Sequence, residues 1–139
     1  MFVTSDTARA ALLPAIDDGN RAKVASAPVT VIIGYDREFY RAFDVLAPHR
    51  TDGGGRFASD AVFAEQTAFR NGTLQGGYLI LAARDVGPVQ GFDNDAVDAL
   101  YFGGTAVRSN FLCNLGYGDP ADLPAKPPRL SFDAACRVL

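Results

Sequence analysis

The sequence of 139 residues has no tryptophan, one histidine and two cysteines. Cys113 and Cys136 lie far apart and show no Cys-x-x-Cys spacing, and only His49 could join them around a metal ion. The pattern therefore argues against a disulfide framework and against a zinc site, and we expect no metal. We expect both cysteines to be small, buried side chains in a reducing compartment.

The sequence also has no excess of positive charge and no long apolar run. Thirteen Lys and Arg residues against sixteen Asp and Glu residues give a net charge of −3, whereas a nucleic-acid-binding surface is usually basic. No apolar segment approaches the length of a transmembrane helix, and residues 1–4 do not resemble the start of a secretory signal. We therefore expect a cytoplasmic protein with no nucleic-acid partner and no membrane partner.

Length and composition predict a single folded domain over residues 1–139, because 48% hydrophobic and 21% charged residues are ordinary values for a globular chain. Apolar periodicity, caps and breakers divide the chain into elements. The expected strands are residues 2–4, 29–33 and 111–117. The first expected helix runs through residue 13, where Pro14 breaks or restarts it, and Gly19-Asn20 marks its end. A second, short helix runs through residue 24. The later helices are expected over residues 38–46 and 59–84, from Asp93 or Asn94, and from Phe132.

The predicted helix over residues 59–84 is the longest, with Ser59 as its cap. Its second half, residues 74–83, is apolar on nearly every side, and such a helix must be buried all round. Gly72 and Gly76 share one face, where another backbone could approach closely. Either this is a core helix of a monomer or it lies against a second subunit, and we favour a homodimer.

The clearest predicted loop is residues 48–56, with Gly53-Gly54-Gly55 at its centre. A glycine triplet can bind phosphate, but phosphate loops follow a strand and precede a lysine and a helix, so a surface loop is the better interpretation. His49 lies in this loop. As a titratable group it could donate a proton to a substrate carbonyl, although a lone loop histidine is more often only solvated.

Three later segments carry a resemblance to a known family. They are Gly87-Pro88-Val89-Gln90-Gly91-Phe92-Asp93, then Asn114-Leu115-Gly116-Tyr117-Gly118-Asp119, then Pro128-Arg129-Leu130-Ser131-Phe132. With Ala68-Phe69-Arg70-Asn71 before them, they resemble the FMN-dependent nitroreductase family, and within it the branch of malonic semialdehyde reductases. The resemblance implies an α+β, nitroreductase-like fold, in which helices flank a central β-sheet and a long buried helix lies at a homodimer interface.

The same resemblance implies where a flavin would bind. Backbone groups of Gln90 and Gly91 would face N5 of the ring, with Pro88 and Val89 packed beside it. A glycine suits this position, because a residue without Cβ lets the backbone approach a flat ligand closely. Arg129 matches the second of two basic residues that reach the flavin phosphate in the family. Lys126 stands one residue before the position of the first, where this chain has Pro127.

The resemblance begins at residue 2, and the amino-terminal segment of the family, with its phosphate-binding residues, has no counterpart in these 139 residues. Either the protein is a naturally shortened relative or further residues precede this sequence. Two hypotheses follow. The first is an FMN-dependent NAD(P)H oxidoreductase whose small-molecule substrate is a small aldehyde like malonic semialdehyde, a quinone or a nitroaromatic; we then expect weak FMN binding. The second is a flavin-deficient remnant of the fold that acts as a binding or scaffold protein.

Overall fold

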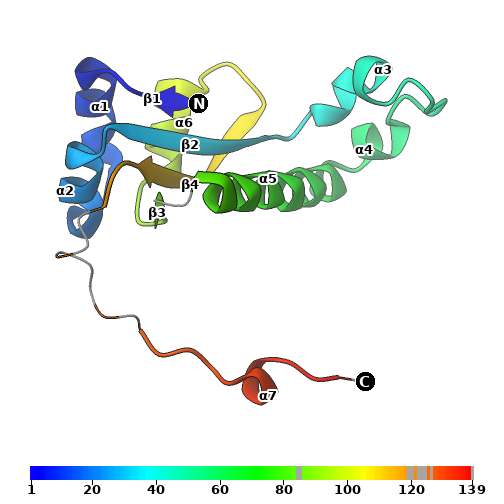
Figure 1. Ribbon diagram of the computed structural model, residues 1–139. Helices are drawn as coiled ribbons and strands as arrows, with labels where there is room; N and C mark the ends of the chain where they lie inside the picture. The colour runs from blue at the N-terminus through cyan, green and yellow to red at the C-terminus, as the bar shows by residue number, and fades with distance from the viewer. Residues whose placement is uncertain (84–85, 119–120, 122–124, 126, 139) are drawn as a thin grey trace.

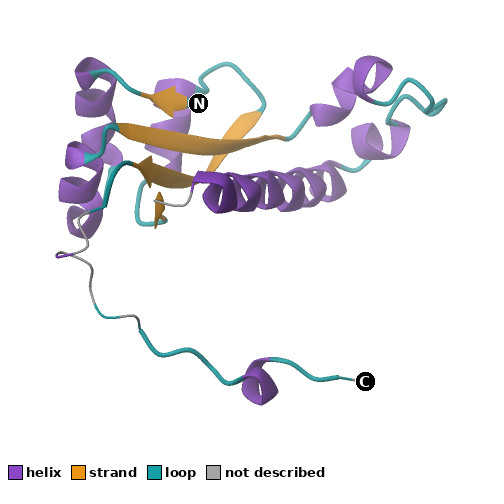
Figure 2. Cartoon of the chain, in the orientation of Figure 1, coloured by secondary structure: helices purple, strands orange, loops and turns teal. Residues whose placement is uncertain are grey.

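The computed structural model describes residues 1–83, 86–118, 121, 125 and 127–138 (Figures 1 and 2). Its centre is a four-stranded antiparallel sheet in the order β1-β2-β4-β3. The strands are β1 (Phe2–Val3), β2 (Val29–Asp36), β3 (Val86–Val89) and β4 (Val107–Leu115). The predicted strands are confirmed, although β2 runs three residues further and β4 begins four residues earlier than expected.

The long central strands β2 and β4 pair from Val29↔Leu115 to Asp36↔Val107, with a bulge between Ile33 and Gly34. The β-branched run of β2 suits this position, because both faces of a central strand are covered. The short strand β3 lies at one edge of the sheet, where Pro88 can be tolerated because proline cannot donate to a ladder.

Helices cover both faces of the sheet. One face packs against α1 (Asp6–Leu12), a 3₁₀ turn η1 (Leu13–Ala15), α2 (Asp18–Ser26) and α6 (Asn94–Tyr101). The core on this face is aliphatic and consists of Val3, Leu12, Ile16, Val24, Ile32, Val89, Val97 and Leu112. The long helix α5 (Ala61–Ala83) covers the other face, where Leu79 and Ile80 pack on Val31, Phe111 and Cys113.

Several predicted helix ends are confirmed by their capping bonds. Asp93 accepts a hydrogen bond from the Ala96 N–H at 3.0 Å, and Ser131 caps α7 (Phe132–Ala135). Two predictions are wrong. Asp60, not Ser59, caps α5, because its carboxylate accepts from the Phe63 N–H at 2.9 Å while Ser59 ends the short helix α4 (Gly55–Ser59). Gly19-Asn20 lies inside α2 rather than at a helix end, because the turn at Pro14 had already separated the two helices.

The glycine face of α5 lies against the sheet of its own chain. A Cβ at Gly72 would meet Cβ of Tyr35 at 3.0 Å, and a Cβ at Gly76 would overlap the Phe111 ring. The neighbouring stripe is apolar and open instead, since Leu74, Tyr78 and Leu81 are 63%, 73% and 76% exposed. Within one chain this side of the helix is therefore open, and its expected burial on all sides would require a second subunit.

Between β2 and α5 the chain forms three short helical pieces. They are η2 (Phe39–Ala42), α3 (Phe43–Leu46) and α4. The first two replace the single helix expected over residues 38–46, and the third begins at the end of the loop expected over residues 48–56. Aromatic rings join them, because the Phe57 ring contacts those of Phe39 and Phe63 at centroid distances of 4.9 and 5.2 Å. The Arg50 guanidinium lies 5.1 Å from the centre of the Phe43 ring.

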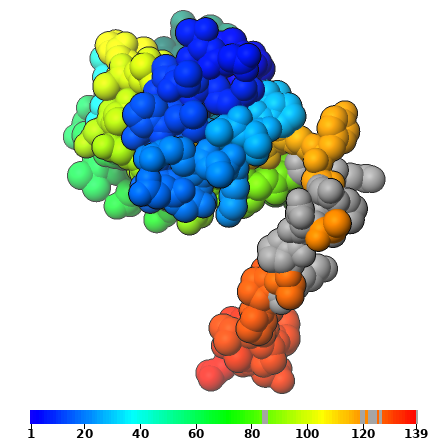
Figure 3. Space-filling model, turned by 90° about the vertical axis from the view of Figure 1, so that its left-hand side faces the viewer, coloured from blue at the N-terminus to red at the C-terminus, as the bar shows by residue number. Residues whose placement is uncertain are grey.

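The carboxyl-terminal segment, residues 127–138, lies away from the sheet and its helices (Figures 1 and 3). All of its residues are exposed, apolar Leu130, Phe132 and Val138 included. Cys113 is buried as predicted, whereas Cys136 on this segment is exposed, so the prediction of two buried cysteines is wrong for Cys136. No helix in the described part of the chain is long and apolar enough to span a bilayer.

Gly76 and Gly77 give a direct test of the packing of α5. Gly76→Ala should destabilise the protein by about 1–3 kcal/mol, because the added methyl group overlaps the buried Phe111 ring. Gly77→Ala should stabilise it by up to about 1 kcal/mol, since alanine favours a helix and the methyl group meets nothing among the described residues. Urea unfolding of both variants measures this difference, and equal midpoints would contradict the packing.

Candidate functional site

An apolar groove, here named the β3 groove, runs between α5 and the edge strand β3. Its volume is about 570 Å³. Its eight lining residues are two aromatics, a proline, an isoleucine, a glycine and three polar residues: Phe69, Phe111, Pro88, Ile80, Gly77, Thr73, Gln90 and Asn110. Because β3 is the last strand of the sheet, the groove is open along one side.

The two walls of the groove are tied to each other. Asn110 on β4 donates its amide to the Thr73 hydroxyl on α5 at 2.8 Å. Gly77 leaves space in the α5 wall, since a Cβ there meets nothing within 4 Å among the described residues. Ile80 and Phe111 belong to the packed core beneath. The groove therefore has a fixed apolar floor, and the space beside Gly77 is wide enough for a flat molecule to enter.

A second hollow, here named the polar pocket, adjoins the groove and shares Phe69 and Asn110 with it. Its volume is about 530 Å³, and its other lining residues are Tyr35, Asp93, Asn94, Asp95, Arg108 and Ser109. Arg108 is held by carboxylates of α6, with Nε 2.6 Å from Asp98 and an η nitrogen 2.9 Å from Asp95. Its charge is therefore already balanced.

Tyr35 stands at the end of this pocket nearest α5. Its hydroxyl donates to Glu65 at 3.4 Å, and its ring meets that of Phe69 edge to face at 5.6 Å. Burial of the hydroxyl, with the negative charge of Glu65 beside it, raises the pKa of Tyr35 above its ordinary value. The phenol is therefore a neutral donor throughout the physiological range.

The structure brings together some of the predicted flavin-binding residues. Pro88 and Gln90 both line the β3 groove. Val89, between them, points to the opposite face of the sheet and is buried in the aliphatic core. Gly91 lies directly after, and its carbonyl accepts a hydrogen bond from the Asp17 N–H at 3.1 Å. The predicted motif thus alternates between groove and core, as a strand requires.

The other predicted residues lie apart from the groove in one copy of the chain. Arg129 is exposed on the carboxyl-terminal segment and donates to the Pro127 carbonyl at 2.9 Å. Lys126 lies outside the described residues. His49 is exposed in the loop before α4 and lines neither the groove nor the polar pocket.

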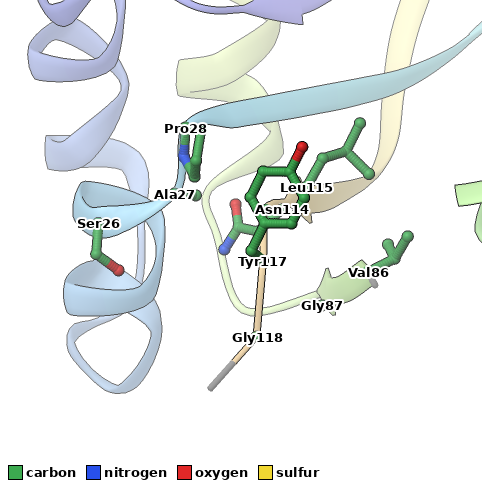
Figure 4. Close-up of a pocket in the computed structure, with 10 residues that line it drawn as sticks. Ser26, Ala27, Pro28, Val86, Gly87, Asn114, Leu115, Tyr117 and Gly118 are labelled. Atoms are coloured by element: carbon green, nitrogen blue, oxygen red, sulfur yellow. The ribbon is translucent and has the colours of Figure 1, made fainter. Parts of the chain in front are cut away.

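A third hollow, of about 560 Å³, lies at the far end of β4. Figure 4 shows it between the start of β2, the start of β3 and the residues that follow β4. Its apolar lining comes mainly from Ala27, Pro28, Val86 and Leu115, with the ring of Tyr117. The Tyr117 phenol is the one ionisable side chain among the described lining residues, so they offer no carboxylate, imidazole, amine or thiol. No cluster that could hold a metal ion occurs elsewhere in the described chain.

Comparison with curated proteins shows close relatives. A protein of Xanthomonas oryzae pv. oryzae named "Putative NADH dehydrogenase/NAD(P)H nitroreductase" is 52% identical over 141 residues, which cover 99% of this chain and 71% of that protein. A protein of Burkholderia lata with the same description is 53% identical over 142 residues, covering 99% of this chain and 72% of the relative. The chain belongs to the nitroreductase family. No model of a protein family matches it.

Solved structures agree with this fold. A nitroreductase-family protein of Streptococcus pneumoniae superposes with a TM-score of 0.79 at 22% identity, covering 100% of this chain and 78% of the other. A structure from Exiguobacterium sibiricum, described as a nitroreductase in complex with FMN, gives 0.77 at 15% identity, covering 100% and 76%. The predicted α+β nitroreductase-like fold is confirmed.

Of the eight residues that line the groove, only Pro88 and Gln90 were predicted as site residues. Thr73, Gly77, Ile80 and Asn110 were not predicted as site residues, although each lines it. A signal existed for Asn110, because a polar residue next to the buried run that starts at Phe111 is unusual in a central strand. For Gly77 the signal was that it directly follows Gly76 inside a helix, although no described atom lies close enough to require a glycine there.

Proposed function

We propose that this nitroreductase-family protein is an FMN-dependent NAD(P)H oxidoreductase and that the β3 groove binds the flavin ring. The observation that carries the proposal is the joint position of Pro88 and Gln90 on the groove wall, opposite the gap at Gly77. The names of the relatives include NADH dehydrogenase and NAD(P)H nitroreductase, and one structural neighbour is described with FMN bound.

The dimensions and chemistry of the groove fit a flavin. Pockets for small ligands have volumes of about 300–1,000 Å³ and are mostly apolar with a few placed polar groups, and the groove has about 570 Å³. Pro88, Ile80 and Phe111 can pack on the faces of a flat ring, while Thr73 and Asn110 can meet its polar edge. Arg108 is a poor candidate for the phosphate, because two carboxylates already pair with it.

The β3 ladder provides a backbone donor on the groove side. Proline has no N–H, so Pro88 and Cys113 form a non-hydrogen-bonded pair. The backbone groups of successive residues in a strand point alternately to its two sides. Continued to Gln90, the alternation directs the N–H of this residue away from β4 and towards the open edge, where a ring nitrogen could accept it.

Bound FMN supplies the hydride chemistry that the side chains lack, with NAD(P)H as the reductant. The chain itself positions the ligand, because the apolar floor packs against it. The Tyr35 hydroxyl, which donates to Glu65, lies at the end of the adjoining polar pocket as a neutral group that can accept a hydrogen bond. We propose a small aldehyde like malonic semialdehyde, a quinone or a nitroaromatic as the second substrate. Within one chain His49 lines neither the groove nor the polar pocket, so we assign it no role in this proposal.

We further propose that the protein is a homodimer that pairs through the exposed stripe of α5. Leu74, Tyr78 and Leu81 each follow a groove residue by one position, so this stripe borders the open side of the groove. A contiguous exposed apolar face of this kind marks an interaction surface. A second copy placed there would close the groove, and Arg129 on its exposed carboxyl-terminal segment would be available for the phosphate.

Gly77→Leu tests the groove. The leucine side chain should fill the space opposite Pro88 and weaken FMN binding by at least about tenfold, or about 1.4 kcal/mol, while the fold is kept because no described atom lies within 4 Å of the new Cβ. Fluorescence titration with FMN measures the affinity. Gly19→Leu on α2, where a Cβ also meets no described atom, is the matched control. Unchanged affinity in Gly77→Leu would refute the groove as the flavin site, and a parent protein that binds no FMN would favour the scaffold hypothesis.

Leu81→Glu tests the dimer. A charge in the centre of an apolar interface should return the mass of one chain, 14.8 kDa, where the parent gives about twice that value in light scattering. Val45→Glu on α3 is the control, because Val45 has the same 76% exposure on a different surface. A monomeric parent protein at micromolar concentration would refute the proposal.

Arg129→Ala tests the phosphate contact. A charge-assisted hydrogen bond typically contributes about 1.5–3 kcal/mol, so FMN binding should weaken by about ten- to hundredfold. Binding of lumiflavin, which has no phosphate, should stay the same. Arg137→Ala removes another exposed arginine of the same segment and should leave both affinities unchanged. Equal FMN affinity in the parent and in Arg129→Ala would leave Arg129 as a solvated charge.

A further inference from the structure

The loop that follows β3 is held by the other side of the molecule. The Asp17 N–H donates to the Gly91 carbonyl at 3.1 Å, and the Asp93 N–H donates to the Ala15 carbonyl at 2.8 Å. Between these bonds, Ile16 and Phe92 form an isolated antiparallel bridge. The junction between η1 and α2 therefore acts as a short extra strand beside the loop.

This junction is itself well anchored. Ile16 is buried in the aliphatic core. The Arg21 guanidinium donates to the carbonyls of Ile16 and Leu13 at 3.0 and 3.3 Å. Whatever touches the junction is therefore held in place relative to the sheet, since neither the core nor these bonds can shift freely.

Gly91 is pressed directly against two side chains of this junction. A Cβ at Gly91 would lie 2.6 Å from Oδ2 of Asp17 and 2.8 Å from Nδ2 of Asn20, both closer than atoms in contact can be. Gly87, four residues earlier in the same segment, has no described atom within 4 Å of its Cβ position. The atoms nearest to a Cβ at position 91 are therefore the ends of two side chains of the junction, on the side away from the β3 groove.

In the described part of the chain, the Asp17 side chain does not cap the helix that begins after it. Asp17 is the N-cap residue of α2, where aspartate normally accepts a hydrogen bond from the first turn. Within the described chain its side chain makes no such capping bond. Its carboxylate lies against Gly91 instead.

We propose that Asp17 and Asn20 are positioning residues that set how far the Gln90–Gly91 peptide stands into the β3 groove. This inference rests on the proposed flavin function of that groove. A side chain at position 91 would meet the ends of the Asp17 and Asn20 side chains, so it displaces the peptide unless these ends rotate away. Groups that bind a cofactor must be held within about 0.5 Å of their productive position, so Asp17 and Asn20 act on the ligand through Gly91.

The test compares three variants of the full chain with the parent: Gly91→Ala, the pair Asp17→Ala with Asn20→Ala, and all three substitutions together. Gly91→Ala should lower kcat/KM by about ten- to hundredfold, the loss expected for a misplacement near 1 Å, and should shift the visible absorption band of bound FMN. The triple variant should recover the rate and the band of the Asp17/Asn20 pair, because the added methyl group then has room. Gly87→Ala is the matched control for adding a methyl group.

Each outcome is decisive. If the triple variant is as impaired as Gly91→Ala, the glycine is required by the ligand and the proposal is overturned. The thermal midpoint of the apo protein gives a separate answer that needs no flavin. Gly91→Ala should lower it more than Gly87→Ala does, and the loss should shrink in the Asp17/Asn20 background. Additive losses would overturn the proposed contact of Gly91 with Asp17 and Asn20, even if FMN binds. A parent protein that binds no FMN would overturn the proposed function alone.

Discussion

The pairing of β2 with β4 is the constraint on which the rest of the molecule depends. These two strands hold the central ladder from Val29↔Leu115 to Asp36↔Val107, and both cores form on their two faces. Because side chains alternate along a strand, Leu112 packs towards α6 while Phe111 packs towards α5. A slip of one residue would exchange the two layers and remove the floor of the β3 groove.

The local features of the fold could be predicted because each depends on neighbouring residues. The apolar run of β2, the caps at Asp93 and Ser131 and the break at Pro14 are properties of a few consecutive side chains. The wrong predictions concern positions whose structure depends on contacts between residues far apart in the sequence. Ser59 and Asp60 are both good caps, and only the fold of the preceding aromatic cluster places Asp60 at the start of α5.

The candidate site was predictable only on one side. Pro88 and Gln90 were recognised because they belong to a continuous motif, and they do line the groove. The opposite wall comes from α5 and from Asn110, which no continuous pattern connects to β3. The glycine at position 91 was explained by a ligand, whereas Asp17 and Asn20, more than seventy positions earlier, provide a reason within the chain itself.

The two edges of the sheet have a consequence for the behaviour of the protein in concentrated solution. An exposed edge strand offers unpaired backbone groups to other chains and can lead to aggregation. Here β1 has only two residues, and β3 has four with Gly87 and Pro88 at its centre. Proline on the outer side of β3 presents no donor to an approaching strand, and a glycine contributes little to a new ladder. Pro88, which lines the β3 groove, thus also protects the chain from edge-to-edge polymerisation.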